Sequence, residues 1–148
     1  MSNVTPKEDT LGHIMSKPAR TVGASDRLSD ALELMVKHDI GAVIVVENSK
    51  PIGIITERDV TRTILKENDI LQKRVSALIS KPLITATPKM PVQEAFELML
   101  KNKIRRLPVL EDNNLTGIVT EKDLMRWVLR VSYEPNIPPH IKAVLENT

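Results

Sequence analysis

A motif of the form Gly-x-x-Thr-x-x-Asp, with apolar residues after the glycine, occurs twice, as Gly53–Asp59 and Gly117–Asp123. Each copy stands where a predicted strand ends and a predicted helix begins. A helix N-terminus offers free N–H groups and partial positive charge, which attract phosphate. A carboxylate at that place can accept two hydrogen bonds from a ribose diol. The chemistry that the motif favours is therefore recognition of a ribose and its phosphate.

The same residue types also suit a purely structural role. Thr56 and Thr120 can cap the helices that follow them, and Asp59 and Asp123 can complete the capping boxes. An acidic residue in the first turn also suits the helix dipole. Either effect stabilises the helix by about 1 kcal/mol, which is enough to account for these residue types. The presence of the motif at matched places in a repeat favours binding, and capping stays open as the alternative.

A tandem repeat supplies the elements that position the motifs. Shifted by 64 residues, the sequence matches itself without a gap, with 18 of 50 pairs identical between residues 13–62 and 77–126. A unit of this length, present only twice, is not a solenoid, and it indicates a pseudo-two-fold pair that shares one core. The predicted organisation is a lead over residues 1–10, a first repeat over 11–68, a linker over 69–74, a second repeat over 75–131 and a tail over 132–148.

Each repeat follows a β-α-β-β-α pattern. In the first copy, Arg20–Val22 is extended, and a helix runs from Leu28 to His38 with apolar residues at i, i+3, i+4 and i+7. The β-branched runs Val43–Val46 and Ile52–Ile55 predict a hairpin, and a second helix begins at Glu57. The predicted fold class is therefore α/β (α+β), with two βαββα repeats.

The helices carry more apolar residues than their buried stripes need. A wide buried face would explain the excess, but its presence in both copies of a small chain favours contact with another subunit. The candidate residues for such a homodimer are Leu34, Val36, Leu98, Leu100 and Met125.

Composition excludes several classes of function. Leu, Ile and Val make up 44 of the 148 residues, which indicates a folded chain. The absence of cysteine excludes disulfides, Cys-ligated zinc, iron–sulfur clusters and a thiol nucleophile. The three histidines lack metal-ligand spacing, so no metal site is predicted. No nucleophile–base pair, paired carboxylates or phosphate-loop lysine appears, so we expect no enzyme and no catalytic cofactor.

Location and nucleic-acid binding are also constrained. The N-terminus is polar, and the longest apolar run, Ala42–Val46, is far too short to cross a bilayer, so we expect a cytoplasmic protein. The net charge of +2 is too balanced for an obligate polyanion binder. The aromatic residues Phe96, Trp127 and Tyr133 are too few to stack bases. A basic patch at Lys101–Arg106 leaves nucleic-acid binding as an unfavoured alternative.

The sequence resembles a pair of CBS domains (named after cystathionine beta-synthase), the arrangement called a Bateman module. The resemblance covers residues 11–131 and rests on His13–Ser16, Asp30–Met35, Ile40–Val45, Gly53–Asp59, their second-copy partners and Arg106–Val109. It implies that two βαββα units pack sheet to sheet and form two equivalent clefts for adenosine-containing ligands. The implied ligands are AMP, ADP, ATP or S-adenosylmethionine.

The resemblance also implies the residues of each cleft. One cleft places Thr120 and Asp123 on the ribose and comprises Ser16, Arg20, Ile40, Gly41, Arg106, Ile118, Thr120, Lys122 and Asp123. The other places Thr56 and Asp59 on the ribose and comprises Ile54, Thr56, Arg58, Asp59, Ser80, Ile84, Ile104 and Arg105. Arg58 and Lys122 add charge at the helix starts, or are simply solvated there.

The two clefts are predicted to be unequal. Gly41 and Ala42 in the first copy match Arg105 and Arg106 in the second. Family members often carry a basic residue at the position of Arg106, where it meets phosphate. The Asp123 cleft therefore has the phosphate charge and, through Gly41, the room, whereas Arg105 crowds the other cleft.

The function implied is a stand-alone regulatory module that binds an adenosyl ligand and signals to an unknown effector protein. The signal would be a change of shape or assembly, which requires that the ligand bind two states with different affinity. The alternative of another class is a ligand-independent interaction module, in which the Thr-x-x-Asp motifs only cap helices and the tail 132–148 contacts a partner. The third is a nucleic-acid binder under ligand control.

Overall fold

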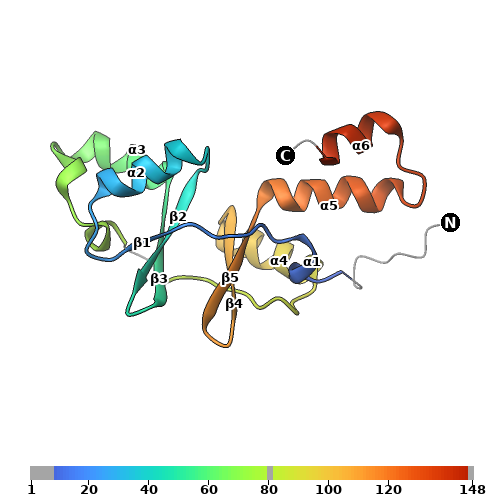
Figure 1. Cartoon of the computed structure of the whole chain (residues 1–148), viewed down its shortest axis with the longest axis horizontal. Coiled ribbons are helices and arrows are strands. Elements are labelled where there is room, and N and C mark those ends of the chain that lie inside the picture. The colour runs from blue at the N-terminus through green and yellow to red at the C-terminus, as the bar shows by residue number, and fades with distance from the viewer. Residues whose placement is uncertain (1–8, 80–81, 147–148) are drawn as a thin grey trace. The chain divides into compact units, whose positions relative to one another are not determined.

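The computed structural model describes residues 9–79 and 82–146 (Figure 1). Its helices and strands, in chain order, are α1 (Leu11–Ile14), β1 (Thr21–Gly23), α2 (Leu28–Lys37), β2 (Ala42–Glu47), β3 (Lys50–Thr56), α3 (Glu57–Lys66), the 3₁₀ helices η1 (Ile70–Gln72) and η2 (Val75–Leu78), α4 (Val92–Asn102), β4 (Arg106–Glu111), β5 (Asn114–Thr120), α5 (Glu121–Tyr133) and α6 (Pro139–Glu146).

The described residues divide between two compact units. The first-repeat unit contains Ala19–Ile84 and Asn113–Leu115. The second-repeat unit contains the described residues of Met1–Pro18, Thr85–Asp112 and Thr116–Thr148. The units therefore depart from the sequence repeats, because residues before Pro18 pack with the second repeat.

The first-repeat unit contains a three-stranded sheet in the order β1-β2-β3. β1 runs parallel to β2, with Val22 opposite Val45, and β2 runs antiparallel to β3. The hairpin between β2 and β3 turns at Asn48 and Ser49, which have φ values of 51° and 65°. Two successive positive φ values are typical of the tight turns whose twist matches that of paired strands.

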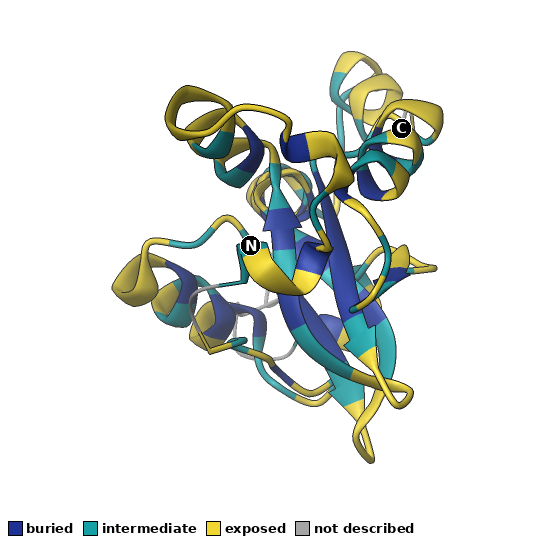
Figure 2. Cartoon of the chain, turned by 90° about the vertical axis from the view of Figure 1, so that its left-hand side faces the viewer, coloured by how far each residue is buried: buried dark blue, intermediate teal, exposed yellow. Residues whose placement is uncertain are grey.

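The core of this unit lies between the sheet and its helices. Val43 and Val45 alternate along β2 and are completely buried, together with Leu28 and Ala31 of α2. Figure 2 shows that many of the buried residues lie on the strands and that the helices are largely exposed on one side. This is the pattern that the i, i+3, i+4 spacing of α2 predicts.

The second-repeat unit has a two-stranded sheet, β4-β5, and only an isolated parallel bridge, Ala86 to Val109, where the first repeat has β1. Pro108 explains the difference. Its counterpart Ile44 donates its backbone N–H to the carbonyl of Arg20 at 2.9 Å. Proline has no N–H, so this rung of the ladder is missing in the second repeat.

The segment that leads each sequence repeat packs on the other repeat. In the second-repeat unit, Leu11 is fully buried and donates to the carbonyl of Met90 at 2.9 Å. Ser16 then pairs with Ile118 of β5 through two backbone hydrogen bonds of 2.8 and 3.1 Å. The equivalent segment in the first-repeat unit includes η2, whose Val75 donates to the carbonyl of Asp26 at 2.8 Å.

The motif glycines make this exchange possible. A Cβ atom on Gly117 would lie 2.9 Å from both the sulfur of Met15 and the carbonyl oxygen of Ser16. A Cβ atom on Gly53 would lie 2.7 Å from side-chain carbons of Ile79, which is the repeat equivalent of Met15. Each glycine therefore leaves room for the lead segment of the other repeat to cross its strand.

Two helices complete the second-repeat unit. α5 carries Trp127, whose ring lies 6.1 Å from that of Phe96 and whose Nε1 donates to Asp9 at 2.7 Å. α6, a helix of eight residues within the tail, packs against α5. None of the helices in residues 9–79 and 82–146 has both the length and the apolar character needed to span a bilayer.

Candidate functional site

The two Thr-x-x-Asp motifs form nearly identical helix caps. In the first copy, Oδ2 of Asp59 accepts the backbone N–H and the hydroxyl of Thr56, both at 2.9 Å. In the second copy, Oδ2 of Asp123 accepts the same two donors of Thr120 at 2.9 and 3.1 Å. The threonine hydroxyls complete the boxes by accepting the aspartate N–H groups. Capping is therefore real in both copies, and it uses one carboxylate oxygen.

The second carboxylate oxygen of Asp123 points into a different environment. Oδ1 accepts the hydroxyl of Ser16 at 3.0 Å and lies 3.7 Å from Nη1 of Arg126. Asp123 is only 6% exposed, and it is the buried charged residue of the described chain. A buried carboxylate is stable only when donors surround it, and a ribose hydroxyl would be one further donor of the kind that Ser16 already supplies.

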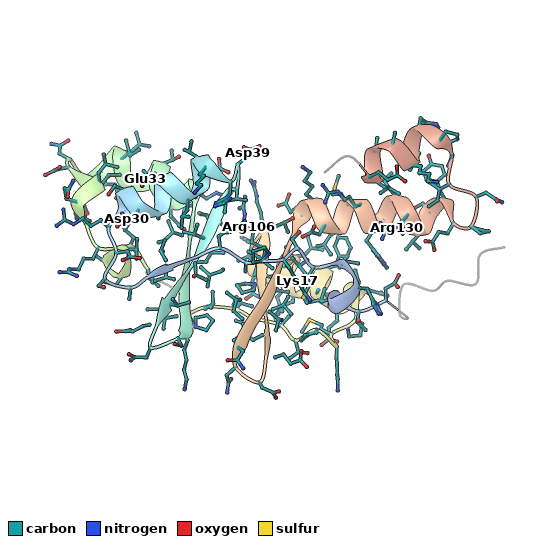
Figure 3. All side chains as sticks on the ribbon, in the orientation of Figure 1. Lys17, Asp30, Glu33, Asp39, Arg106 and Arg130 are labelled. Carbon is teal, nitrogen blue, oxygen red and sulfur yellow. The ribbon has the colours of Figure 1, made fainter. Side chains whose placement is uncertain are left out.

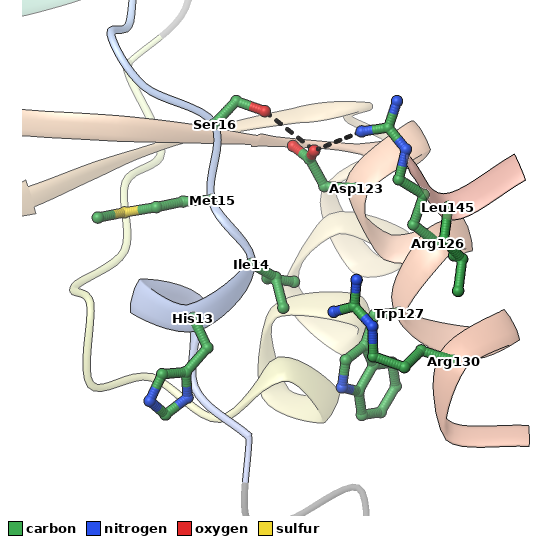
Figure 4. A pocket seen from close by; sticks show the side chains of 9 residues that line it. All are labelled: His13, Ile14, Met15, Ser16, Asp123, Arg126, Trp127, Arg130 and Leu145. Atoms are coloured by element: carbon green, nitrogen blue, oxygen red, sulfur yellow. Dashed lines mark hydrogen bonds and ion pairs between the residues drawn. The ribbon is translucent and has the colours of Figure 1, made fainter. Parts of the chain in front are cut away.

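A pocket of about 240 Å³ opens beside Asp123 in the second-repeat unit (Figure 4). Ser16, Asp123 and Arg126 lie together at one end of it, and Arg130 and Trp127 lie further along α5. The full lining is His13, Ile14, Met15, Ser16, Asp123, Arg126, Trp127, Arg130 and Leu145. The pocket therefore combines a hydrogen-bonding carboxylate with two guanidinium groups.

Ser16 and Asp123 are the two residues of this pocket that were predicted from the sequence for the ligand site, and the other lining residues were not predicted. Arg126 and Arg130 follow Asp123 at i+3 and i+7, so the three residues lie on one face of α5. That spacing is a signal available in the sequence. The participation of Leu145 had no such signal, because it depends on how α6 packs.

The remaining residues proposed for the Asp123 cleft divide between the two units. The second-repeat unit holds Ile118 on β5, the exposed Lys122 on α5 and Arg106 at the start of β4. Arg106 is labelled in Figure 3. The first-repeat unit holds Arg20, Ile40 and Gly41.

The charge of Arg20 also affects the pKa of a neighbouring histidine, His38. The pKa of His38 lies below its ordinary value because of desolvation, and next because of repulsion from Arg20 and Lys37.

The residues proposed for the Asp59 cleft divide in the same way. Ile54, Thr56, Arg58, Asp59 and Ile84 belong to the first-repeat unit, and Ile104 and Arg105 belong to the second-repeat unit. Ser80 lies outside the described residues.

Arg105 forms an exposed ion pair with Glu121, with 3.2 Å between Nε and Oε1. Exposed ion pairs of this kind contribute little to stability.

No group of three or more acidic or histidine side chains suited to a metal ion occurs among residues 9–79 and 82–146.

Comparison with known proteins agrees with the fold and the repeats. The CBS domain profile matches residues 11–66 and 75–130. The CBS domain-containing protein YhcV of Bacillus subtilis is 36% identical over 110 residues, covering 74% of this chain and 79% of YhcV. The crystal structure of the CBS domain pair of protein MJ0100, in complex with 5-methylthioadenosine and S-adenosyl-L-methionine, has a TM-score of 0.74 and 28% identity, covering 80% of this chain and 94% of that one.

An enzyme also shares this region. Inosine-5'-monophosphate dehydrogenase of Methanocaldococcus jannaschii is 34% identical over 115 residues, which cover 76% of this chain but 22% of the enzyme. The likeness is therefore confined to about a fifth of that enzyme. The predicted fold and the predicted resemblance are confirmed, and this chain belongs to the CBS domain family, with two CBS domains in tandem.

Proposed function

We propose that this chain is a regulatory module, as CBS domain pairs are. It binds an adenosine-containing ligand at Asp123, and at a second site at Asp59, and signals occupancy to a partner protein. The observation that carries the proposal is the pair of matched caps, in which one aspartate oxygen completes the cap while the other, at Asp123, meets the donors Ser16 and Arg126.

The solved relative supports the class of ligand. Protein MJ0100 was crystallised with 5-methylthioadenosine and S-adenosyl-L-methionine. Both molecules contain a ribose diol, the group that a carboxylate at a helix N-terminus can hold. We therefore propose that this chain recognises the adenosyl group, which these ligands share with AMP, ADP and ATP.

The two sites are proposed to be unequal. The Asp123 site would use Thr120 and Asp123 on the ribose, Ile118 against the base and Arg106 on the phosphate. Arg106 is half-buried at the start of β4, where its charge is screened less than at the surface. The Asp59 site has Ala42 at the matching position and is the weaker binder of a phosphorylated ligand.

The signal would be a change of assembly or of shape. Val36, Leu100 and Met125 are 82%, 76% and 67% exposed, whereas Leu34 and Leu98 are half-buried. Large exposed apolar side chains are typical of interaction surfaces. We therefore propose a homodimer through these helix faces, with Leu34 and Leu98 at its edge, and a ligand that favours one arrangement of the two copies.

Calorimetric titration with AMP, ATP and S-adenosylmethionine tests the proposal. We expect saturable binding that weakens about 10- to 100-fold in Asp123→Ala, because a hydrogen bond to a charged group contributes about 1.5–3 kcal/mol. Asp59→Ala should remove only a second, weaker binding phase of the titration.

Asp30→Ala is the matched control for lost capping. Asp30 also completes a capping box, by accepting the N–H of Arg27 at 3.0 Å, but it is exposed and outside both motifs. It should leave binding unchanged. Equal losses in Asp30→Ala and Asp123→Ala, or no heat with any ligand up to millimolar concentration, would contradict the proposal and favour a ligand-independent interaction module.

A further inference from the structure

The pocket beside Asp123 is too small for a whole nucleotide. Its volume is about 240 Å³, whereas pockets for complete small-molecule ligands occupy about 300–1,000 Å³. It therefore suits one part of a larger ligand, or a small ion. Ser16 and Asp123 lie at one end, so a ligand whose ribose rests on Asp123 would extend from that end into the pocket (Figure 4).

The charges of the pocket favour an anion. Its lining has two guanidinium groups, Arg126 and Arg130, and one carboxylate, Asp123. The carboxylate already accepts hydrogen bonds from Thr120 and Ser16. Within residues 9–79 and 82–146, no carboxylate forms an ion pair with the guanidinium of Arg130. One positive charge therefore remains in excess at the pocket.

The spacing of the two arginines matches an extended phosphorylated group. At 1.5 Å per residue, Arg126 and Arg130 lie about 4.5 and 10.5 Å beyond Asp123 along α5. Arginine presents paired N–H donors that fit the oxygens of a phosphate. The sulfonium centre of S-adenosylmethionine would be repelled by the guanidinium groups, and its one methionyl carboxylate carries less negative charge than a phosphate.

The tail completes the pocket. Leu145 of α6 lines it, and α6 packs against α5. The tail lies beyond the matched CBS domain, which ends at residue 130. In the first repeat, the equivalent positions on α3 are Arg62 and Lys66, which keep the positive charge, but α3 is followed by η1 instead of a helix packed along it. The charges are thus common to both copies, whereas the enclosure belongs to the second copy.

We infer that this pocket, and not Arg106 alone, binds the phosphoryl group of the ligand through Arg126 and Arg130, so that the Asp123 site prefers a phosphorylated adenosine to S-adenosylmethionine. The inference rests on the proposed function in one respect, since it places the ribose of the same ligand on Asp123. The phosphoryl group itself could belong to a nucleotide or to free phosphate, and the two are separable by titration.

The experiment compares ATP, adenosine, S-adenosylmethionine and inorganic phosphate on the full chain by calorimetry. The variant is Arg126→Gln with Arg130→Gln, and the matched control is Arg62→Gln with Lys66→Gln. We expect the variant to lose at least tenfold in affinity for ATP, because hydrogen bonds between charged partners are lost. Its affinity for adenosine should fall less than its affinity for ATP, because Arg126 also lies 3.7 Å from the Asp123 carboxylate, and the control should leave the tighter phase of ATP binding unchanged.

Each outcome separates this inference from the proposed function. Loss of ATP binding in the arginine variant but not in Asp123→Ala would support the phosphoryl pocket and overturn the ribose assignment. Phosphate binding that only the arginine variant loses would support the pocket as a site for the free ion. Unchanged ATP affinity in the arginine variant, an equal loss in the Arg62 and Lys66 control, or an equal loss for adenosine would overturn the inference.

Discussion

Replacing Gly117 by alanine should loosen the contact that brings Ser16 to Asp123. The new Cβ atom would lie 2.9 Å from the carbonyl oxygen of Ser16 and 2.9 Å from the sulfur of Met15. The methionine side chain can move aside, but the Ser16 carbonyl is backbone and also accepts the N–H of Ile118 at 3.1 Å. The lead segment must therefore shift away from β5.

The expected cost follows from that contact. Overpacking of a buried site costs about 1–3 kcal/mol, and weakening of the two backbone hydrogen bonds between Ser16 and Ile118 adds to it. A loss of about 2 kcal/mol in the free energy of unfolding corresponds to a fall of about 4–8 °C in Tm for a chain of this size. The hydrogen bond from Ser16 to Asp123 should weaken as well.

Thermal and urea unfolding monitored by circular dichroism measure this change, with Gly23→Ala as the control. A Cβ atom on Gly23 would come no closer than 3.4 Å to Asp26, an ordinary contact, so the control should change stability by less than about 0.5 kcal/mol. Equal stability of Gly117→Ala and the native chain would show that the lead segment can cross β5 beside an alanine, so that a glycine is not required there.

Three further predictions concern other contacts. Asp9→Ala should lower the free energy of unfolding by about 1–2 kcal/mol in urea titration, because it removes the acceptor 2.7 Å from the Trp127 indole; no change would mean that water replaces it at no cost. Val36→Glu with Leu100→Glu should give a monomer in sedimentation velocity, since both side chains are largely exposed; a persisting dimer would place the interface elsewhere. Ser16→Ala should lower the free energy of unfolding by about 1.5–3 kcal/mol in urea titration, because it removes the 3.0 Å hydrogen bond to the buried Asp123 carboxylate; an unchanged or higher stability would contradict the bond's role.

Local patterns in the sequence were sufficient to predict the repeated elements. The apolar spacing of Leu28, Ala31 and Met35 specifies a helix face, and these residues are buried in α2. The Thr56 and Asp59 pair specifies a cap, and the cap forms. These signals depend on residues within one turn or one hairpin, so they do not require knowledge of the tertiary structure.

The exchange of lead segments could not be predicted in this way. The residue pattern near Leu11 and Ser16 does not indicate which copy they pack on, because both copies offer an equivalent glycine and strand. Only the family resemblance placed Ser16 beside Asp123. The shortened sheet of the second repeat was readable in principle, since Pro108 lacks the N–H that Ile44 uses. Leu145 lines the pocket only because α6 packs on α5, and nothing in the local sequence indicates that long-range contact.

A crystal structure of the chain soaked with AMP would show directly whether Asp123 holds the ribose. We expect electron density for the nucleotide with its ribose hydroxyls within hydrogen-bond distance of the Asp123 carboxylate and its phosphate next to Arg126 or Arg130. Density for AMP away from both Asp123 and Asp59, or no density at saturating concentration, would mean that the two motifs are helix caps and do not bind this ligand.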